Sequence, residues 1–340
     1  MRAVVLRKHG GPEALELADI ARPEISGDRV LVRVAACGLN HLDLWTRRGL
    51  PGREIAFPHV LGNEPVGTVE ELGPEARGVK VGDRVVVAPG YLDRFHANRS
   101  GWDASFPDYR VRGHQSAGGY AEFVSARAEN LVRVSDRWSM AQWAATPLVF
   151  LTAWHMLVGR ARTQPGETVL VIAAGSGVGS SAIQIGRWLG CRVIATAGTQ
   201  EKLAKAAQLG AHHGVNHYEE NWPARVRELS GGGVDVVVEH VGEAVFSKAV
   251  TALRYGGRLV TCGATTGPAG SVNLTHLFAK QLSVLGSYMG DFAELERVLA
   301  LLDAGLLRPV VDRVFPLEEA AEAHRYLESN AHFGKVVLEV

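Results

Sequence analysis

The pattern of hydrophobic and polar positions changes character about half-way along the chain. In the first 135 residues, short apolar or alternating runs are separated by turn clusters such as Gly10-Gly11-Pro12, and no helical period lies between them. This pattern predicts a β-barrel-like domain of about 130 residues. The expected strands are 3–6, 15–19, 29–34, 66–72, 84–87, 120–123 and 131–134. Residues 88–117 show little pattern and are expected to form a long loop or lobe.

Helical patterns begin with an expected helix at 140–158, and from residue 168 to about residue 288 strand-like runs alternate with helical patterns. Strands are expected there at 169–172, 191–195, 234–239 and 258–262, with a helix at 200–209, and two further helices are expected at 292–304 and 316–327. Such alternation predicts a right-handed parallel sheet. A closing strand at 335–340 is expected to pack, with the helices before it, on the first domain, which would make that domain discontinuous.

The stretch 168–189 is the most informative part of the chain. An apolar run ends in a small-residue turn, which leads into a helix whose Ile183, Ile185 and Leu189 can face a sheet. The turn follows the pattern Ala174-x-Ser176-x-x-Gly179. Strand, glycine-rich turn and helix together predict a dinucleotide-binding unit, because backbone N–H groups and a helix N-terminus must approach a pyrophosphate. A tight turn without a ligand is the alternative.

Composition limits the possible functions. The 340 residues suit two domains, and 46% hydrophobic and 21% charged residues are values typical of globular proteins. A net charge of zero gives no reason to expect nucleic acid or an acidic membrane surface as a partner. No apolar run reaches about 18 residues, and the first residues lack a signal-peptide layout, so a cytoplasmic, soluble protein is expected. The three cysteines are expected to be free thiols.

Several segments resemble a known family in their order and spacing. They are MRAVVLRKHGGPEALEL, GLNHLDLW, LGNEPVGTVEELG, GVKVGDRVV, GGYAEF, PLVFLTAWHML and FGKVVL. Together they resemble the medium-chain dehydrogenase/reductase superfamily, and its zinc-independent quinone oxidoreductase branch more than its zinc alcohol dehydrogenases. The resemblance implies an α/β protein with a GroES-like β-barrel catalytic domain (1–149, completed by 289–340) and a Rossmann doubly wound parallel sheet (150–288). It also implies an active site in the cleft between them.

The resemblance bears directly on metal binding. Zinc members of the superfamily have a Cys where this chain has Asn40, a His where it has Asn63, and a second Cys near Leu148, whereas Glu64 is kept. An amide is a poor zinc ligand and leucine is none, so we expect no catalytic zinc. Cys37 stands three residues before the ligand position and is expected to be a small buried hydrophobe.

The second, structural zinc site of the family needs four cysteines in the lobe, and none occurs between Cys37 and Cys191. The lobe does contain Asp93, His96 and His114, but their spacing matches no closed zinc site. We therefore expect a solvated loop there and no metal at either site.

The end of the second strand of the Rossmann unit indicates the cofactor. NAD-binding members use an acidic residue there to bind the ribose 2′-hydroxyl, and this chain has Ala197. A 2′-phosphate would meet no carboxylate, and Thr199, Lys202 and His217 are candidates to bind it. The sequence therefore favours NADP(H), and NAD(H) stays possible because no Arg stands beside Ala197.

The remaining cofactor residues fall into two groups. The turn residues expected along the pyrophosphate are Ala174, Ser176, Gly177, Val178 and Gly179. The resemblance places Val241 and Gly242 near a ribose, and Cys262, Gly263 and Ser287 near the nicotinamide carboxamide. Lys335 is a weaker candidate for a phosphate contact.

Without a Lewis acid, a substrate already activated by conjugation suits the cleft best, so a quinone or an α,β-unsaturated carbonyl compound is the expected hydride acceptor. The catalytic candidates implied by the resemblance are Asn40, Trp45, Asn63, Glu64 and Thr152. The two amides are expected to stabilise the developing oxyanion, Trp45 to form an apolar wall, and Thr152 to lie near the nicotinamide. Asp43 and Glu64 are also expected to hold the structure through hydrogen bonds. His41 and His155 are either proton carriers or packed side chains, so no proton donor is assigned.

Two other functions stay open at this point. One is a zinc-type alcohol dehydrogenase or carbonyl reductase with an unusual ligand set, and the other is an NADPH-binding protein without physiological turnover. The oligomeric states usual in this family predict a homodimer or homotetramer, and the expected substrate is a small molecule.

Overall fold

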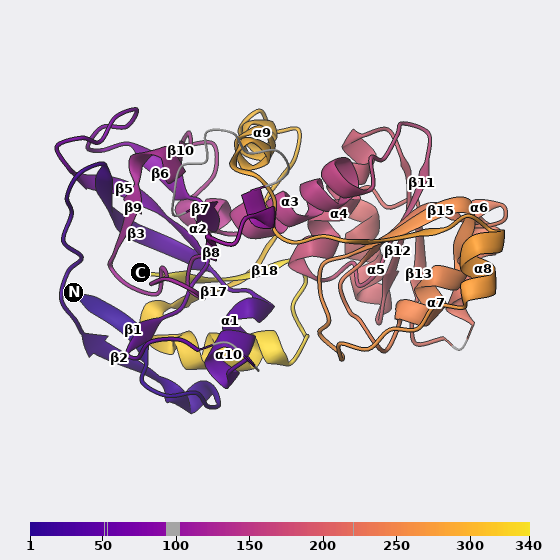
Figure 1. Cartoon of the computed structure of the whole chain (residues 1–340), viewed down its shortest axis with the longest axis horizontal. Coiled ribbons are helices and arrows are strands. Elements are labelled where there is room, and N and C mark those ends of the chain that lie inside the picture. The colour runs from indigo at the N-terminus through magenta and orange to yellow at the C-terminus, as the bar shows by residue number, and fades with distance from the viewer. Residues whose placement is uncertain (51, 53, 93–102, 220) are drawn as a thin grey trace. The chain divides into compact units, whose positions relative to one another are not determined.

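The computed structural model describes residues 1–50, 52, 54–92, 103–219 and 221–340, which divide into two compact units (Figure 1). Unit 1 comprises Met1–Leu148 and Gly290–Val340, and unit 2 comprises Val149–Met289. The expected division assigned residues 149 and 289 to the first domain, and in the structure both belong to unit 2. Asp93 and His96 lie outside the described residues.

The main sheet of unit 1 combines strands from both ends of the chain. Its order is β10 (Leu131–Arg133), β6 (Arg84–Val87), β5 (Glu64–Leu72), β3 (Arg29–Gly38), β18 (Lys335–Glu339) and β17 (Val311–Pro316), with β9 (Phe123–Arg127) also paired to β3. Val30, Val32 and Val34 alternate along β3 and pack on one core cluster. Antiparallel pairing places Leu338 of β18 opposite Cys37, so the last strand of the chain lies beside β3 (Figure 1).

Smaller elements complete unit 1. A three-stranded sheet has the order β2 (Leu15–Asp19), β1 (Arg2–Leu6) and β4 (His59–Val60), and the helices are α1 (His41–Arg48), α2 (Met140–Ala144), α9 (Phe292–Asp303) and α10 (Ala320–Glu328). Short 3₁₀ turns lie at Pro12–Ala14, Asp103–Ser105, Ala128–Asn130 and Leu317–Glu319. The lobe at 88–117, which was expected to be a loop, contains some regular structure, since β7 (Gly90–Leu92) pairs with β8 (Tyr109–Val111) within its described residues.

Three local predictions differ from the structure. The helix expected at 316–327 begins only at Ala320, because Pro316 ends β17 and Leu317–Glu319 forms a 3₁₀ turn. The strand expected at 120–123 begins only at Phe123, because Tyr120 is fully buried and donates its backbone N–H to the loop carbonyl of Leu61. The single helix expected at 140–158 consists of α2, α3 (Pro147–Trp154) and a π-helical turn at His155–Arg160. Pro147 explains the break, since proline has no N–H to continue α2 and restricts the residue before it.

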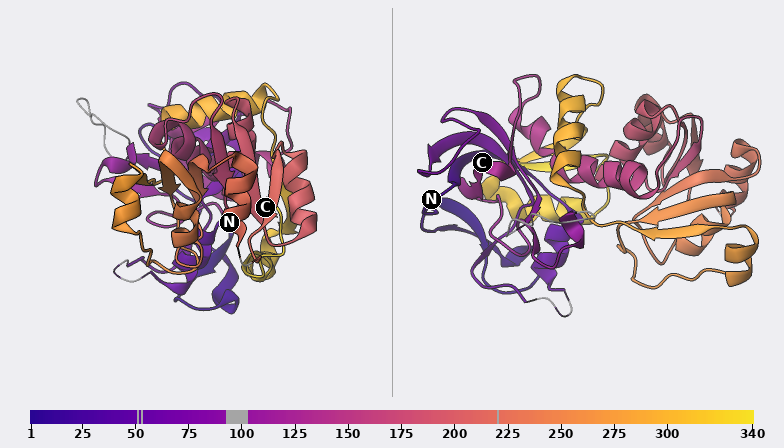
Figure 2. Two further views of the ribbon diagram at one scale, coloured as in Figure 1. Left: turned by 90° about the vertical axis from the view of Figure 1, so that its right-hand side faces the viewer. Right: turned by 45° about the horizontal axis from the view of Figure 1, so that its top comes forward.

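Unit 2 contains a parallel sheet with helices on both faces (Figure 2). Within the described residues its order is β13 (His213–Asn216), β12 (Arg192–Ala197), β11 (Thr168–Val171), β14 (Val234–Glu239), β15 (Leu253–Thr261) and β16 (Ser283–Gly286). The helices are α4 (Gly177–Trp188), α5 (Gln200–Gln208), α6 (Trp222–Ser230), α7 (Phe246–Thr251) and α8 (Leu274–Ala279). Successive strands are added on one side of β11 as far as β13 and then on its other side from β14 to β16, so the strand order reverses between β11 and β14. Ligands of such sheets bind beyond the carboxyl ends of the strands at this reversal.

No helix in the described ranges is long and apolar enough to cross a membrane. The three cysteines are free thiols, and Cys37 is completely buried as expected.

Candidate functional site

A buried carboxylate, Glu64, organises one cluster of polar residues in unit 1. Its side chain is completely shielded from solvent at the start of β5. Glu64 Oε1 accepts the backbone N–H of Leu148 at 2.7 Å, and Oε2 accepts Asn40 Nδ2–H at 2.9 Å. Such a charge is stable inside a protein only when it is paired and hydrogen-bonded.

The partner of Glu64 is Lys335, at the start of β18. Its ammonium lies 2.6 Å from Glu64 Oε2, and the lysine side chain is 4% exposed. It also donates to Asn40 Oδ1 at 2.7 Å and to the backbone carbonyl of Leu39. An ammonium has three N–H donors, and these three acceptors use all of them. Lys335 is therefore not free to contact a phosphate, and that expectation was wrong.

Asp43 fixes the loop that carries Asn40. Its carboxylate, fully buried on α1, accepts the backbone N–H of Asn40 at 2.8 Å and that of Gly62 at 3.0 Å. Burial raises the pKa of Asp43 to about 7, against the two N–H donors, which favour the ionised form. The expected hydrogen-bonding role of Asp43 is confirmed by these contacts.

The other candidate catalytic residues have different surroundings. Asn63 is completely buried; its Nδ2–H donates to the Arg112 carbonyl at 2.5 Å, whereas Oδ1 has no partner among the described residues. Trp45 is partly exposed on α1, with its ring centroid 6.3 Å from that of His41. In unit 2, Thr152 is 5% exposed on α3 and His155 is 2% exposed in the π-helical turn.

The unit 1 cluster does not fit a zinc ion. Asn40 Oδ1 is bonded to an ammonium, Glu64 already holds three donors, and Leu148 contributes only its backbone N–H. A zinc site needs three protein ligands of the Cys, His or carboxylate type. No group of three or more His, Cys, Asp or Glu side chains is arranged to hold a metal in the described residues.

The glycine-rich turn of unit 2 connects β11 to α4 at the point where the sheet reverses direction. Ser176 is the N-cap of α4, and its hydroxyl oxygen accepts the backbone N–H of Gly179 at 2.8 Å. A Cβ on Gly179 would collide with the carbonyl oxygen of Ala173, so the turn requires glycine there. The completely buried Ala174 and the first residues of α4, Gly177 and Val178, complete the turn. Free N–H groups at such a helix start suit a pyrophosphate.

The end of β12 has the features relevant to a ribose. Ala197 is 2% exposed, and Thr199 caps α5 by accepting the backbone N–H of Lys202 at 3.2 Å. His217 Nδ1 lies 3.2 Å from Thr196 Oγ1. Burial and then the charge of Lys202 lower the pKa of His217, so its imidazole is neutral near pH 7.

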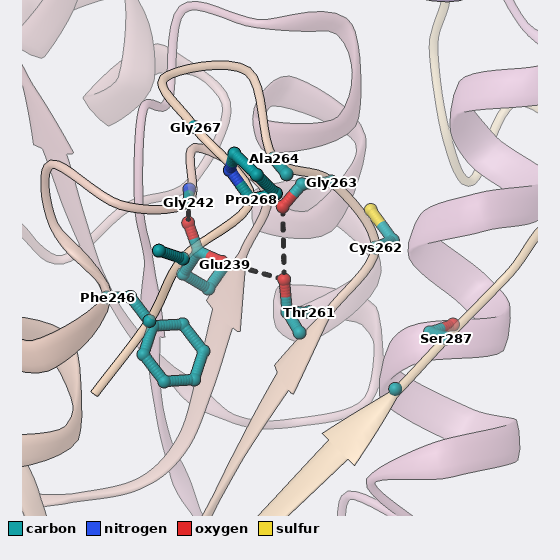
Figure 3. Close-up of a pocket in the computed structure, with 13 residues that line it drawn as sticks. Glu239, Gly242, Phe246, Thr261, Cys262, Gly263, Ala264, Gly267, Pro268 and Ser287 are labelled. Atoms are coloured by element: carbon teal, nitrogen blue, oxygen red, sulfur yellow. Dashed lines mark hydrogen bonds between the residues drawn. The ribbon is translucent and has the colours of Figure 1, made fainter. Parts of the chain in front are cut away.

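Beyond the ends of β14, β15 and β16 lies a pocket of about 480 Å³ (Figure 3). Glu239, at the end of β14, accepts the N–H groups of Val241 at 2.5 Å and Gly242 at 2.6 Å and the Thr261 hydroxyl at 2.7 Å. The pocket lining contains four of the expected cofactor residues, Gly242, Cys262, Gly263 and Ser287. Ser287 Oγ is buried with no partner in the described part of the chain, which leaves it available to a ligand.

Two protein families match the chain. Residues 26–136 match the alcohol dehydrogenase GroES-like domain, and residues 177–304 match the zinc-binding dehydrogenase family. Human quinone oxidoreductase is 32% identical, and the similarity covers 99% of this chain and 97% of that protein. The chain belongs to the medium-chain dehydrogenase/reductase superfamily.

Solved structures of this superfamily confirm the fold of the chain. A crystal structure of an NAD-dependent alcohol dehydrogenase is 45% identical with a TM-score of 0.95, covering 100% of both chains. The crotonyl-CoA carboxylase/reductase AntE in complex with NADP is 26% identical with a TM-score of 0.93, covering 100% of this chain and 94% of that one. The chain is therefore an NAD(P)-dependent oxidoreductase with a GroES-like domain and a Rossmann domain.

The sequence patterns predicted the glycine turn, but they did not single out Glu239 or His240 and did not indicate that Lys335 pairs with Glu64. Glu239 anchors the loop beside the pocket, Lys335 pairs with Glu64, and His240 Nε2 lies 3.0 Å from Ser176 Oγ. A charged or polar residue at either end of an otherwise apolar strand was the available signal for all three.

Proposed function

We propose that this oxidoreductase reduces quinones or α,β-unsaturated carbonyl compounds without a metal. The observation that carries this proposal is the engagement of Glu64 by Lys335 and Asn40, which occupies the one carboxylate beside the positions where zinc members have their ligands. Bound NADPH would supply the hydride. A conjugated acceptor needs no Lewis acid to accept it, because the charge spreads over the conjugated system. The proposed substrate is accordingly a small electron-poor molecule.

Asn40 is the residue to which we assign contact with the developing oxyanion. Its Nδ2 donates one hydrogen to Glu64, and its second N–H has no partner among the described residues. Lys335 holds Oδ1, which fixes the orientation of the amide. The side chain of Asn40 is 8% exposed, whereas Asn63 is completely buried and already donates to a carbonyl. Asn63 therefore supports the loop in this proposal, and Trp45 forms an apolar wall for the substrate.

The cofactor proposed for unit 2 is NADP(H), held by the glycine turn and by the residues around Ala197. The small, uncharged side chain of Ala197 neither repels a 2′-phosphate nor binds a 2′-hydroxyl. Thr199, Lys202 and His217 would bind the phosphate. Val241, Gly242, Cys262, Gly263 and Ser287 would line the ribose and the nicotinamide carboxamide, with Thr152 nearby. The relative described as NAD-dependent makes NADH the competing cofactor.

One experiment tests the reaction and the residue together. NADPH and NADH oxidation are followed with quinones, enones, aldehydes and ketones in wild type, Asn40→Ala and Asn130→Ala. Asn130 is the matched control, because it is a unit 1 asparagine with the same 8% exposure. Loss of one oxyanion donor lowers kcat by about 10²–10³-fold. Equal kcat values in Asn40→Ala and wild type would contradict the assignment.

Two other functions predict different results. A zinc-type alcohol dehydrogenase would oxidise alcohols in a chelator-sensitive way, and the alcohol dehydrogenase at 45% identity is the reason to include alcohols among the substrates. An NADPH-binding protein without turnover would bind the cofactor saturably and oxidise it with no acceptor.

We also propose that the chain forms a homodimer through the β16 edge of unit 2. Exposed apolar side chains lie on this edge strand and on two elements near it. They are Val284 on β16, Tyr255 on β15, and Leu274 and Phe278 on α8. A second copy related by a twofold axis can pair with the same edge and cover the same side chains. Analytical ultracentrifugation should give a dimer for wild type and a monomer for Val284→Asp, and a monomeric wild type would contradict the proposal.

A further inference from the structure

His240 links three parts of the cofactor domain. It follows β14 directly, and its Nε2 lies 3.0 Å from the hydroxyl of Ser176, which caps α4 in the turn that follows β11. This is the point where the sheet reverses direction and where the pyrophosphate of a dinucleotide binds in such folds. The imidazole therefore lies behind the turn that is expected to hold the cofactor.

His240 and Ser176 share one hydrogen bond, and which of the two donates depends on the tautomer of the imidazole. With the hydrogen on Nδ1, Nε2 is an acceptor. Burial lowers the pKa of the imidazole to about 4, so it is neutral at pH 7. In the Nδ1–H tautomer Ser176 donates its hydroxyl hydrogen to His240 while it accepts the N–H of Gly179. In this state the hydroxyl has no hydrogen to donate to a phosphate oxygen.

We propose that binding of the dinucleotide pyrophosphate is coupled to uptake of one proton by His240. The proton comes from solvent and adds to Nε2, which then donates to Ser176 Oγ. This reversal frees the Ser176 hydroxyl to donate to a pyrophosphate oxygen, while Oγ still accepts the Gly179 N–H. The two negative charges of the pyrophosphate favour the imidazolium, because opposite charges nearby stabilise the charged form. The inference rests on dinucleotide binding at the glycine turn.

Other titratable groups near His240 do not account for such a coupling. The carboxylate of Glu239, on the opposite face of the strand end, is bonded to Val241, Gly242 and Thr261. Burial raises the pKa of Cys262 to about 12, so it stays an uncharged thiol. The turn and first helical turn, residues 172–181, contain no titratable side chain. His217, after β13, is assigned to the 2′-phosphate, which ADP-ribose lacks, and the exposed His276 on α8 serves as the control.

The test is calorimetric titration of ADP-ribose into the full chain between pH 5 and pH 8. ADP-ribose carries the pyrophosphate but no 2′-phosphate, whose own pKa near 6 would obscure the result. An anion pair that raises the pKa of His240 by about two pH units makes binding about tenfold tighter at pH 5 than at pH 8. Titrations in buffers of different ionisation enthalpy should then show uptake of about 0.8 proton per site at pH 5.

Variants assign the proton. In His240→Gln the pH dependence and the proton uptake should disappear, whereas His276→Gln should keep both. The proposal is overturned if wild type binds ADP-ribose equally well at pH 5 and pH 8, or if His276→Gln alone removes the dependence. Absence of ADP-ribose binding at every pH would overturn dinucleotide binding at the turn as well. If His240→Gln does not fold, NMR titration of the wild-type imidazole with and without ADP-ribose gives the same decision, since an unchanged pKa refutes the coupling.

Discussion

Replacing Lys335 with methionine removes the only cation that touches the buried Glu64 in the described structure. Methionine has nearly the same length and flexibility as lysine, so the change keeps most of the packing and deletes the ammonium. Glu64 would keep its contacts with Asn40 and Leu148, and its charge would remain without a counterion.

The structure sets the size of the effect. Lys335 is 4% exposed and Glu64 is 0% exposed, so solvent cannot replace the lost ammonium. Breaking such a buried pair costs about 3–5 kcal/mol, because an uncompensated charge remains inside the protein. For a domain of about 200 residues, each kcal/mol lowers the melting temperature by about 2–4 °C, which predicts a decrease of about 10 °C in the melting temperature of unit 1.

The assay is thermal unfolding of Lys335→Met, Glu64→Gln and the double variant. Removal of both charges should recover more than half of the stability lost in Lys335→Met, because the uncompensated carboxylate no longer exists. Arg7→Met is the matched control, since Arg7 and its partner Glu16 are 56% and 53% exposed, and its expected effect is below about 1 kcal/mol. The reasoning is refuted if Lys335→Met behaves like this control, or if the losses of the two single variants simply add.

Three further predictions concern other parts of the molecule. Gly179→Ala should weaken NADPH binding at least tenfold in a fluorescence titration, because its Cβ collides with the Ala173 carbonyl, and unchanged affinity would exclude the turn as the cofactor site. Ala197→Asp should raise the Kd for NADPH at least tenfold and leave that for NADH the same or lower, since a carboxylate repels the 2′-phosphate; equal effects on both would contradict this reasoning. Burial and the Arg47 and Arg48 charges lower the pKa of His324 to about 3 from an unfolded value near 6.5, so its stabilisation is complete above pH 6.5 and is lost as the pH falls towards 3. Urea unfolding should therefore show wild type losing about 2 kcal/mol more than His324→Gln between pH 7 and pH 5, and parallel losses would contradict the shift.

Local patterns predicted the four central strands of the parallel sheet because these strands are rich in buried apolar residues, and they missed the two edge strands β13 and β16, which are largely exposed or half-buried. They missed α1 for a physical reason. This helix buries Asp43, Thr46 and Arg47, so polar residues occupy positions where an amphipathic pattern needs apolar ones. Arg47 is balanced there by Glu328 at 2.5 Å and by His324 at 3.0 Å, both on α10.

The partner of the buried carboxylate was beyond prediction from local patterns. Lys335 lies 295 residues after Asn40, and only the pairing of β18 with β3 brings the two together. Hydrophobic periodicity reports which face of a strand is buried and carries no information about its neighbour in the sheet. The glycine turn was predictable because strand, turn and helix are contiguous, so every contact of Ser176 with Gly179 is local.

The central claim is hydride transfer to a conjugated acceptor without a metal. It is tested most directly by NADPH oxidation with a quinone and an enone, measured on one preparation before and after dialysis against a chelator, with the metal content determined on the same sample. The account predicts the same kcat before and after dialysis and far less than one zinc per chain. One zinc per chain, with activity lost on its removal and restored on its return, would contradict it.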